Sequence, residues 1–135
     1  MTFSQATDNW HPQALAALRI MTGLLFMAHG TMKLFNFPAG DSPMSLDLFS
    51  LMGVAGILEF FGGLLIVLGL FTRPVAFVLS GMMAVAYFMA HAPQGFYPAL
   101  NGGDAAILFC FVFFYLVFAG PGAWSVDGIR RRSPA

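Results

Sequence analysis

Hydrophobic residues dominate four long stretches of the chain, at approximately residues 12–35, 51–71, 74–92 and 103–119. A helix that crosses a bilayer needs about 20 mostly apolar residues, because the hydrocarbon core is about 30 Å thick. Each stretch falls within the range of lengths that such helices show. The pattern therefore predicts an all-α protein, a transmembrane four-helix bundle that forms a single domain over residues 1–135.

Residues at the ends of these stretches predict where the helices begin and end. Pro12 suits the first turn of a helix, and the first stretch ends before Pro38. Thr72 and Arg73 alone join the second and third stretches, and Pro74 opens the third. So short a turn makes these two helices antiparallel neighbours.

Two longer connections, residues 36–50 and 93–102, separate the remaining stretches. Residues 44–51 form a short amphipathic piece, for which we expect a re-entrant or interfacial segment. Phe96 and Tyr97 suit the boundary between lipid and water. Both connections are therefore predicted to lie on the same side of the membrane.

The distribution of basic residues predicts the orientation of the bundle. An even number of spans places both termini on one side. That side carries Arg73 and the run Arg130, Arg131 and Arg132, whereas the other side has only Lys33. Basic residues concentrate on the cytoplasmic side of membrane proteins. Both termini are therefore predicted to be cytoplasmic.

Composition narrows the class of protein further. Hydrophobic residues make up 59% of the chain and charged residues only 9%, whereas a soluble domain carries roughly 25% charged residues. Lipid must therefore cover much of the surface, which makes the bilayer the first partner. A net charge of zero argues against nucleic acid as a partner.

The N-terminal segment argues against a cleaved signal, and the lone cysteine argues against a disulfide-bonded, thiol-redox or metal-binding protein. No Lys or Arg precedes the first apolar stretch, so we expect no cleaved signal, and the first stretch is expected to stay as an anchor of a multi-pass membrane protein. Cys110 alone provides no disulfide, no redox pair and no metal site, and its apolar surroundings favour a packing role.

Each apolar stretch nevertheless carries ionisable or polar residues along one helical face. Such groups are costly in lipid, roughly 2.5 to 3.5 kcal/mol each, and they usually face the bundle interior. Six of them fall in the half of the membrane that holds the two longer loops, and they predict a polar ligand-binding pocket there. These residues are His29, Lys33, Glu59, His91, Asn101 and Asp104.

The alternative for the same residues is a set of structural pairs, such as Lys33 with Glu59 or Asp104. Arg19 falls outside the group, in the other half of the membrane. It can pair with a tyrosine or a carbonyl, or extend to the headgroups. We assign Arg19, Tyr87 and Tyr115 a supporting structural role, and no metal site is predicted.

The order and spacing of these residues resemble the DoxX family of small bacterial four-helix membrane proteins, from about residue 18 to residue 127. Asp104 is a departure, because many relatives carry a glutamate there. The motifs that carry the resemblance are Arg19, His29-Gly30 and Lys33; Glu59, Gly62-Gly63, Gly69 and Thr72-Arg73; Asn101 and Asp104; and Gly120-Pro121-Gly122 followed by Ser125, Asp127 and Gly128.

The resemblance implies the fold more strongly than the chemistry. The family takes its name from a subunit associated with archaeal thiosulfate:quinone oxidoreductase and terminal oxidase, and some relatives are linked to oxidative-stress and thiol-redox complexes. It implies a redox-linked membrane subunit that binds a quinone or a small sulfur oxyanion. At most this is an oxidoreductase subunit without its own redox centre.

Three functions stay open on the sequence alone. The first is the redox-linked subunit, with a quinone as its ligand and a redox-enzyme subunit as its partner. A haem between His29 and His91 is a minor variant of this hypothesis. The second is a small-solute carrier, for which four helices are few unless the protein forms a homo-oligomer. The third is a structural anchor or assembly factor for a membrane complex.

Overall fold

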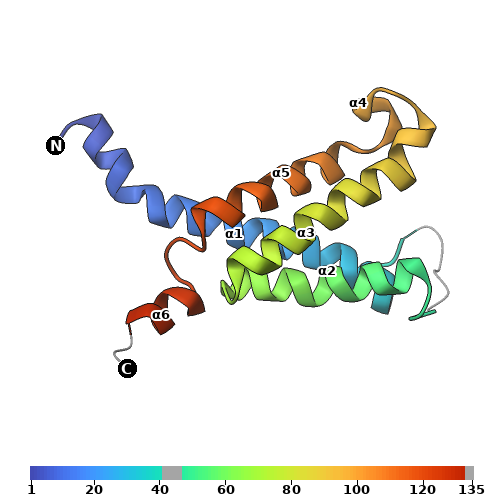
Figure 1. Ribbon diagram of the computed structural model, residues 1–135, viewed down its shortest axis with the longest axis horizontal. Helices are drawn as coiled ribbons and strands as arrows, with labels where there is room; N and C mark the ends of the chain where they lie inside the picture. The colour runs from blue at the N-terminus through green and yellow to red at the C-terminus, as the bar shows by residue number, and fades with distance from the viewer. Residues whose placement is uncertain (41–46, 133–135) are drawn as a thin grey trace.

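A computed structural model describes residues 1–40 and 47–132 of the protein. Every regular element in these two ranges is a helix (Figure 1). The longer helices are α1 (Phe3–Phe35), α2 (Leu51–Leu68), α3 (Thr72–Ala86) and α5 (Asp104–Ala119). The shorter ones are the π-helix η1 (Tyr87–His91), the 3₁₀-helix η2 (Ala92–Gln94), α4 (Pro98–Asn101) and α6 (Val126–Arg132).

The prediction of an all-helical membrane bundle is confirmed. Three helical segments are long and apolar enough to cross a bilayer: Phe3–Phe35, Leu51–Leu68 and Thr72–Gln94. The fourth, α5, is equally apolar but has only 16 residues. At 1.5 Å per residue it is about 24 Å long, so it spans most of the hydrocarbon core.

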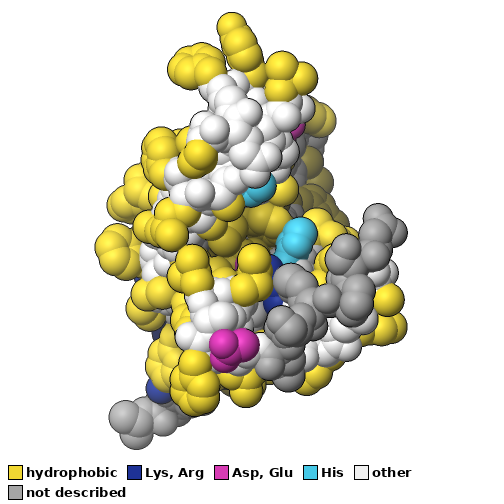
Figure 2. All heavy atoms as spheres, turned by 90° about the vertical axis from the view of Figure 1, so that its right-hand side faces the viewer, with side chains coloured by type: hydrophobic (Ala, Val, Ile, Leu, Met, Phe, Trp, Pro, Cys, Tyr) yellow, Lys and Arg dark blue, Asp and Glu magenta, His cyan; other side chains and the backbone are white. Residues whose placement is uncertain are grey.

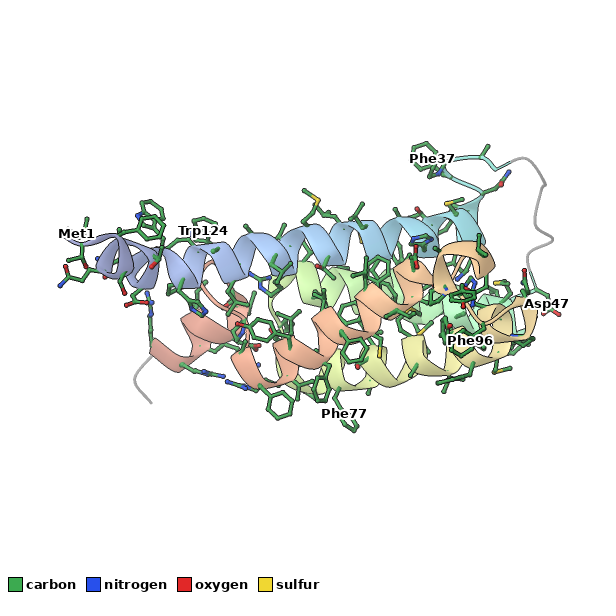
Figure 3. The ribbon with its side chains drawn as sticks, turned by 90° about the horizontal axis from the view of Figure 1, so that it is seen from above. Met1, Phe37, Asp47, Phe77, Phe96 and Trp124 are labelled. Atoms are coloured by element: carbon green, nitrogen blue, oxygen red, sulfur yellow. The ribbon has the colours of Figure 1, made fainter. Side chains whose placement is uncertain are left out.

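The four long helices form two antiparallel pairs, α1 with α2 and α3 with α5 (Figure 1). The pairs meet near the two chain termini and diverge toward the opposite end. Met1 and Trp124 lie at one end, which we call the terminal end, and Phe37, Asp47 and Phe96 lie at the other, the loop end (Figure 3). Both termini therefore lie at the same end; their cytoplasmic location stays a prediction.

Glycines let α1 and α2 approach very closely. They recur seven residues apart on each helix, at Gly23 and Gly30 on α1 and at Gly56 and Gly63 on α2. A Cβ atom added at Gly30 would lie 2.5 Å from the backbone nitrogen of Phe60. Small residues at such positions are how membrane helices gain van der Waals contact, because lipid supplies no hydrophobic drive for their association.

Aromatic side chains fill the core where the two pairs meet. The buried ring of Phe26 on α1 lies 4.9 Å from that of Phe113 and 5.2 Å from that of Phe109, both on α5. Ile66 and Leu79 complete this contact from α2 and α3. The outward faces carry large exposed apolar side chains, such as Phe77 on α3, as expected of a surface in contact with lipid.

The first helix begins earlier than predicted. We expected it to start at Pro12, but α1 begins at Phe3, and Pro12 lies inside it. The reason is a capping box, in which the Thr2 hydroxyl accepts a hydrogen bond from the backbone N–H of Gln5 and the Thr2 N–H donates to the Gln5 side chain. This local cap outweighs the tendency of proline to begin a helix.

The turn between α2 and α3 also differs from the prediction. The second helix was expected to reach residue 71, with Thr72 and Arg73 as the turn, but α2 ends at Leu68 and α3 begins at Thr72. Gly69 ends α2 in the left-handed conformation, at φ +66°. The earlier start of α3 depends on Asp127, whose carboxylate accepts hydrogen bonds from the N–H groups of Phe71 and Thr72.

The loop regions differ from the prediction in two places. The third helix, expected as an α-helix to residue 92, continues beyond Ala86 as the π-helix η1 and the 3₁₀-helix η2, and α4 lies within the expected loop 93–102. Of the amphipathic piece predicted at 44–51, residues 44–46 lie outside the described residues, residues 47–50 form a turn, and Leu51 begins α2.

Replacing Gly30 with alanine should destabilise the bundle, because the new methyl group meets the backbone of α2. We expect Gly30→Ala to lower the free energy of unfolding by about 1–3 kcal/mol, the usual effect of overpacking. Gly81→Ala is the matched control, because a Cβ there meets no atom within 4 Å. Unfolding by SDS, followed by circular dichroism in mixed micelles, measures both. Equal effects of the two variants would contradict the close approach.

Candidate functional site

An ion pair between α1 and α2 is the principal polar feature near the loop end. The Lys33 Nζ atom lies 2.5 Å from Oε1 of Glu59. Lys33 is in the last turn of α1, and Glu59 lies about two turns into α2. The two helices can bring these side chains together because Gly56 leaves room beside the Lys33 stem, with a Cβ at Gly56 only 3.0 Å from the Lys33 Cβ.

Glu59 is buried but only partly satisfied. The residue is 4% exposed, and its second oxygen, Oε2, has no hydrogen-bond partner among the described residues. A carboxylate has room for about four hydrogen bonds. A buried polar atom without a partner costs about 1–3 kcal/mol, and more if it is charged. The Lys33–Glu59 pair therefore includes one buried acceptor, Oε2, that receives no hydrogen bond from the described part of the chain.

His29 lies on the same face of α1 as Lys33, four residues earlier. Its ring packs edge-on against Phe109 of α5, with 5.9 Å between the ring centroids. The side chain is exposed, and neither ring nitrogen makes a hydrogen bond within the described ranges. Both nitrogens are thus free to exchange protons with water or with a ligand.

His91, Asn101 and Tyr87 form a second polar cluster, at the end of the other helix pair. The His91 Nδ1 atom lies 3.1 Å from the carbonyl oxygen of Asn101, and the Tyr87 ring stacks on the His91 ring. The buried Asn101 side chain donates to the Tyr87 hydroxyl and to the carbonyl of Gly95, and it accepts from the N–H of Gly103. Its hydrogen-bonding groups are thus used within its own loop.

Asp104 and Tyr115 are exposed on α5. Within the described part of the chain, neither side chain makes a hydrogen bond or an ion pair. Of the six residues predicted to line a pocket, the structure therefore pairs Lys33 with Glu59 and His91 with Asn101. It shows no polar contact that joins Asp104 to either pair.

The loop end is hollowed on its surface. Figure 2 looks onto this end and shows a depression, along which histidine and lysine or arginine side chains lie among apolar ones. The depression opens where the two helix pairs diverge in Figure 1. No group of three or more His, Cys, Asp or Glu side chains that could hold a metal ion occurs among the described residues.

Arg19 lies near the terminal end, where the helix pairs meet. Its side chain is fully buried and does not extend to the headgroups; instead it donates hydrogen bonds only to carbonyl oxygens. These belong to the last turn of α2 and to the segment after α5, namely Ile66 and Val67, and Pro121, Ala123 and Trp124, at donor–acceptor distances of 2.5–3.1 Å. Arg19 thus holds three parts of the chain together.

Arg73 and Asp127 were not predicted as structural residues, yet each satisfies the end of a helix. Arg73 donates to the carbonyls of Val117 and Phe118 in the last turn of α5. Asp127 caps α3, as described above. Cations favour the C-terminal end of a helix and anions its N-terminal end. The motifs that carry the family resemblance include Arg73 and Asp127, but they do not say which groups these two side chains contact.

Burial raises the pKa of the Asp127 carboxyl. Hydrogen bonds from Thr72 and Phe71 and the charge of Arg131 together lower this pKa by more than burial raises it. The pKa of Asp127 therefore lies below its ordinary value of 3.8. Because the folded-state pKa is lowered, the stabilisation is fully present above that ordinary value and is lost as the pH falls through the folded-state pKa.

Comparison with known proteins places the chain among bacterial membrane proteins. The DoxX family model matches residues 14–92. An uncharacterized protein of Haemophilus influenzae is 43% identical over 131 residues, which cover 89% of this chain and 92% of the relative. An uncharacterized membrane protein of Mycobacterium tuberculosis is 25% identical over 138 residues, which cover 90% of this chain and 83% of the relative. No solved structure matches the chain.

Replacing Arg19 with lysine should destabilise the fold although the charge is kept. An ammonium has three donors and cannot serve five carbonyls on two separate segments. We expect Arg19→Lys to lower the free energy of unfolding by about 3 kcal/mol. Arg132→Lys, at an exposed position that makes no polar contact with the described residues, is the control. SDS unfolding measures both variants, and wild-type stability in Arg19→Lys would show that the carbonyl contacts do not support the fold.

Replacing Asp127 with asparagine should make the protein less stable at pH 7, because α3 loses its charged cap. The difference from the wild type should shrink as the pH falls below about 3.8, where protonation removes the same charge from the wild type. Thermal unfolding of both proteins between about pH 2 and pH 7 measures it. A difference that is constant with pH would contradict the role given to this carboxylate.

Proposed function

The chain belongs to the DoxX family of membrane proteins, and from this premise we propose that it is a redox-linked membrane subunit that binds a quinol at the Lys33–Glu59 pair. The observation that carries the proposal is the buried Oε2 atom of Glu59, which has no hydrogen-bond partner within residues 1–40 and 47–132. An unused acceptor on a buried carboxylate suits a ligand that brings a hydroxyl donor.

The chemistry of a quinol matches the two side chains. Its hydroxyl groups can donate to a carboxylate such as Glu59, and the carbonyls of its oxidised form can accept a hydrogen bond from the Lys33 ammonium. The pair could therefore hold both redox forms of one ring. The aromatic side chains nearby, Phe109 among them, offer apolar surface to a ring that arrives through the lipid.

Charge balance favours a quinol over a small sulfur oxyanion. Lys33 is already neutralised by Glu59, so the pair has no net charge to offer an anion. A dianion such as thiosulfate would have to lose its hydration without gaining a counter-charge, which is costly in a medium of low dielectric constant. A neutral, lipid-soluble quinol does not incur that cost.

Glu59 and His29 would act on protons, while electrons would leave the chain. Oxidation of a quinol to a quinone releases two protons and two electrons. In the proposal, Glu59 takes the two hydroxyl protons of the ligand one after the other, and the exposed His29 passes each of them to water at the loop end. A partner subunit with a redox centre accepts both electrons, because Cys110 alone can form no redox pair.

Location and orientation follow from the same proposal. The start of α3, which carries Arg73, and α6, which carries Arg130 to Arg132, lie at the terminal end, whereas the last turn of α1, which carries Lys33, lies at the loop end. The positive-inside rule then places the terminal end in the cytoplasm of a bacterial cell and the protein in the inner membrane. The quinol site would open toward the outer half of the bilayer.

Replacing Glu59 with glutamine tests the proposal, because glutamine keeps the size of the side chain but is a weaker acceptor. We expect Glu59→Gln to bind a short-chain benzoquinol at least about tenfold more weakly, since a hydrogen bond to a charged group contributes about 1.5–3 kcal/mol. Titration calorimetry of the purified protein in detergent measures the affinity. Asp8→Asn, at the exposed start of α1, is the charge-matched control.

The same variant separates this proposal from a structural role. If Lys33 and Glu59 serve only to join α1 and α2, Glu59→Gln will lower the yield or the unfolding midpoint. The quinol affinity of the protein that remains folded would then equal that of the wild type, and a structural anchor would be the better description.

A further inference from the structure

A pocket lies at the terminal end, away from the Lys33–Glu59 pair. Its volume is about 380 Å³, and it is formed by the start of α3 and by α6. Three arginines line it, Arg73 from α3 and Arg130 and Arg131 from α6, against a single carboxylate, that of Asp127. The lining is therefore positive overall, in a chain whose net charge is zero.

Two charged groups of the pocket already make hydrogen bonds to the backbone, and two others make none among the residues that the structure describes. Asp127 is occupied by the N–H groups that it caps, and Arg73 donates to two carbonyls through one nitrogen, Nη1. The guanidinium of Arg130 lies over the ring of Phe71, 5.3 Å from its centre. Neither Arg130 nor Arg131 makes a hydrogen bond in the described part of the chain, so their donors can serve a ligand.

We propose that this pocket binds the phosphate group of an anionic phospholipid. Guanidinium groups bind phosphate oxygens with paired, charge-assisted hydrogen bonds. Two arginines with free donors on α6 and a third on α3 would grip such a group from two sides. The α6 helix would then be attached to the bilayer surface through the lipid.

The position of the pocket favours a lipid headgroup over a free phosphate ion. It lies at the start of α3, just after the turn that follows α2, where the apolar segments meet the membrane surface. The exposed ring of Phe71 belongs to its wall, and exposed Phe77 follows on α3. These rings continue the pocket onto the apolar face of the bundle, where acyl chains would lie.

Electrostatics favours the same ligand. Juxtamembrane arginines attract anionic lipids with about 1 kcal/mol each, mainly at the cytoplasmic leaflet. Arg132 stands next to Arg131 on α6 but does not line the pocket. A specific headgroup site therefore predicts that Arg131 and Arg132 differ in their contribution, whereas a diffuse attraction predicts that they do not.

Native mass spectrometry of the full-length protein in mild detergent can count bound lipids during a titration with phosphatidylglycerol. Arg131→Gln is expected to weaken its binding about fivefold, and Arg130→Gln similarly. Arg132→Gln carries the same change in net charge and is expected to weaken binding less than about twofold. Phosphatidylcholine, which has a phosphate but no net charge, should bind weakly to all four proteins.

Three results would overturn the proposal. Equal weakening by Arg131→Gln and Arg132→Gln would mean a diffuse attraction. Displacement of phosphatidylglycerol by an equal concentration of inorganic phosphate would mean a site for free anions. Binding by Arg130→Gln and Arg131→Gln equal to that of the wild type would mean that the pocket does not hold the headgroup. Thermal unfolding of each variant confirms that it is folded.

Discussion

The absence of water in the hydrocarbon core of a bilayer is the constraint on which this structure depends, because polar groups there must find partners within the protein. Arg19 is the clearest example of this constraint. A fully buried guanidinium is matched by carbonyls from the end of α2 and from the segment after α5. One side chain thereby satisfies the end of α2 and the backbone of the segment after α5.

The two ends of the bundle meet this constraint differently. At the terminal end, Arg19, Arg73 and Asp127 are all bound to backbone groups, and the helix pairs are held together. At the loop end the pairs diverge, and Glu59 keeps an oxygen without a partner in the described structure. The core is therefore closed at the terminal end, whereas the loop end leaves a buried acceptor unpaired among the described residues.

Hydropathy and spacing predicted most of the fold, because the apolar stretches and the positions of the half-buried Lys33 and the buried Glu59 depend on local sequence. The partners of Arg19 could not be predicted in the same way, since they are backbone carbonyls more than 40 residues away. The cap that Asp127 places on α3 is equally remote in sequence. Asp104 was grouped with Glu59 by its helical face and its depth, and neither says which partner a side chain meets.

The Glu59 carboxylate can be observed directly, because it is the only glutamate in the chain. In protein labelled with carboxyl-¹³C glutamate and reconstituted in lipid, solid-state NMR would follow its resonance during titration with a short-chain quinol. Binding of the ligand hydroxyl to Oε2 predicts a saturable change in the chemical shift of this carboxyl carbon. A resonance that stays unchanged while the quinol binds would place the ligand elsewhere and contradict the account.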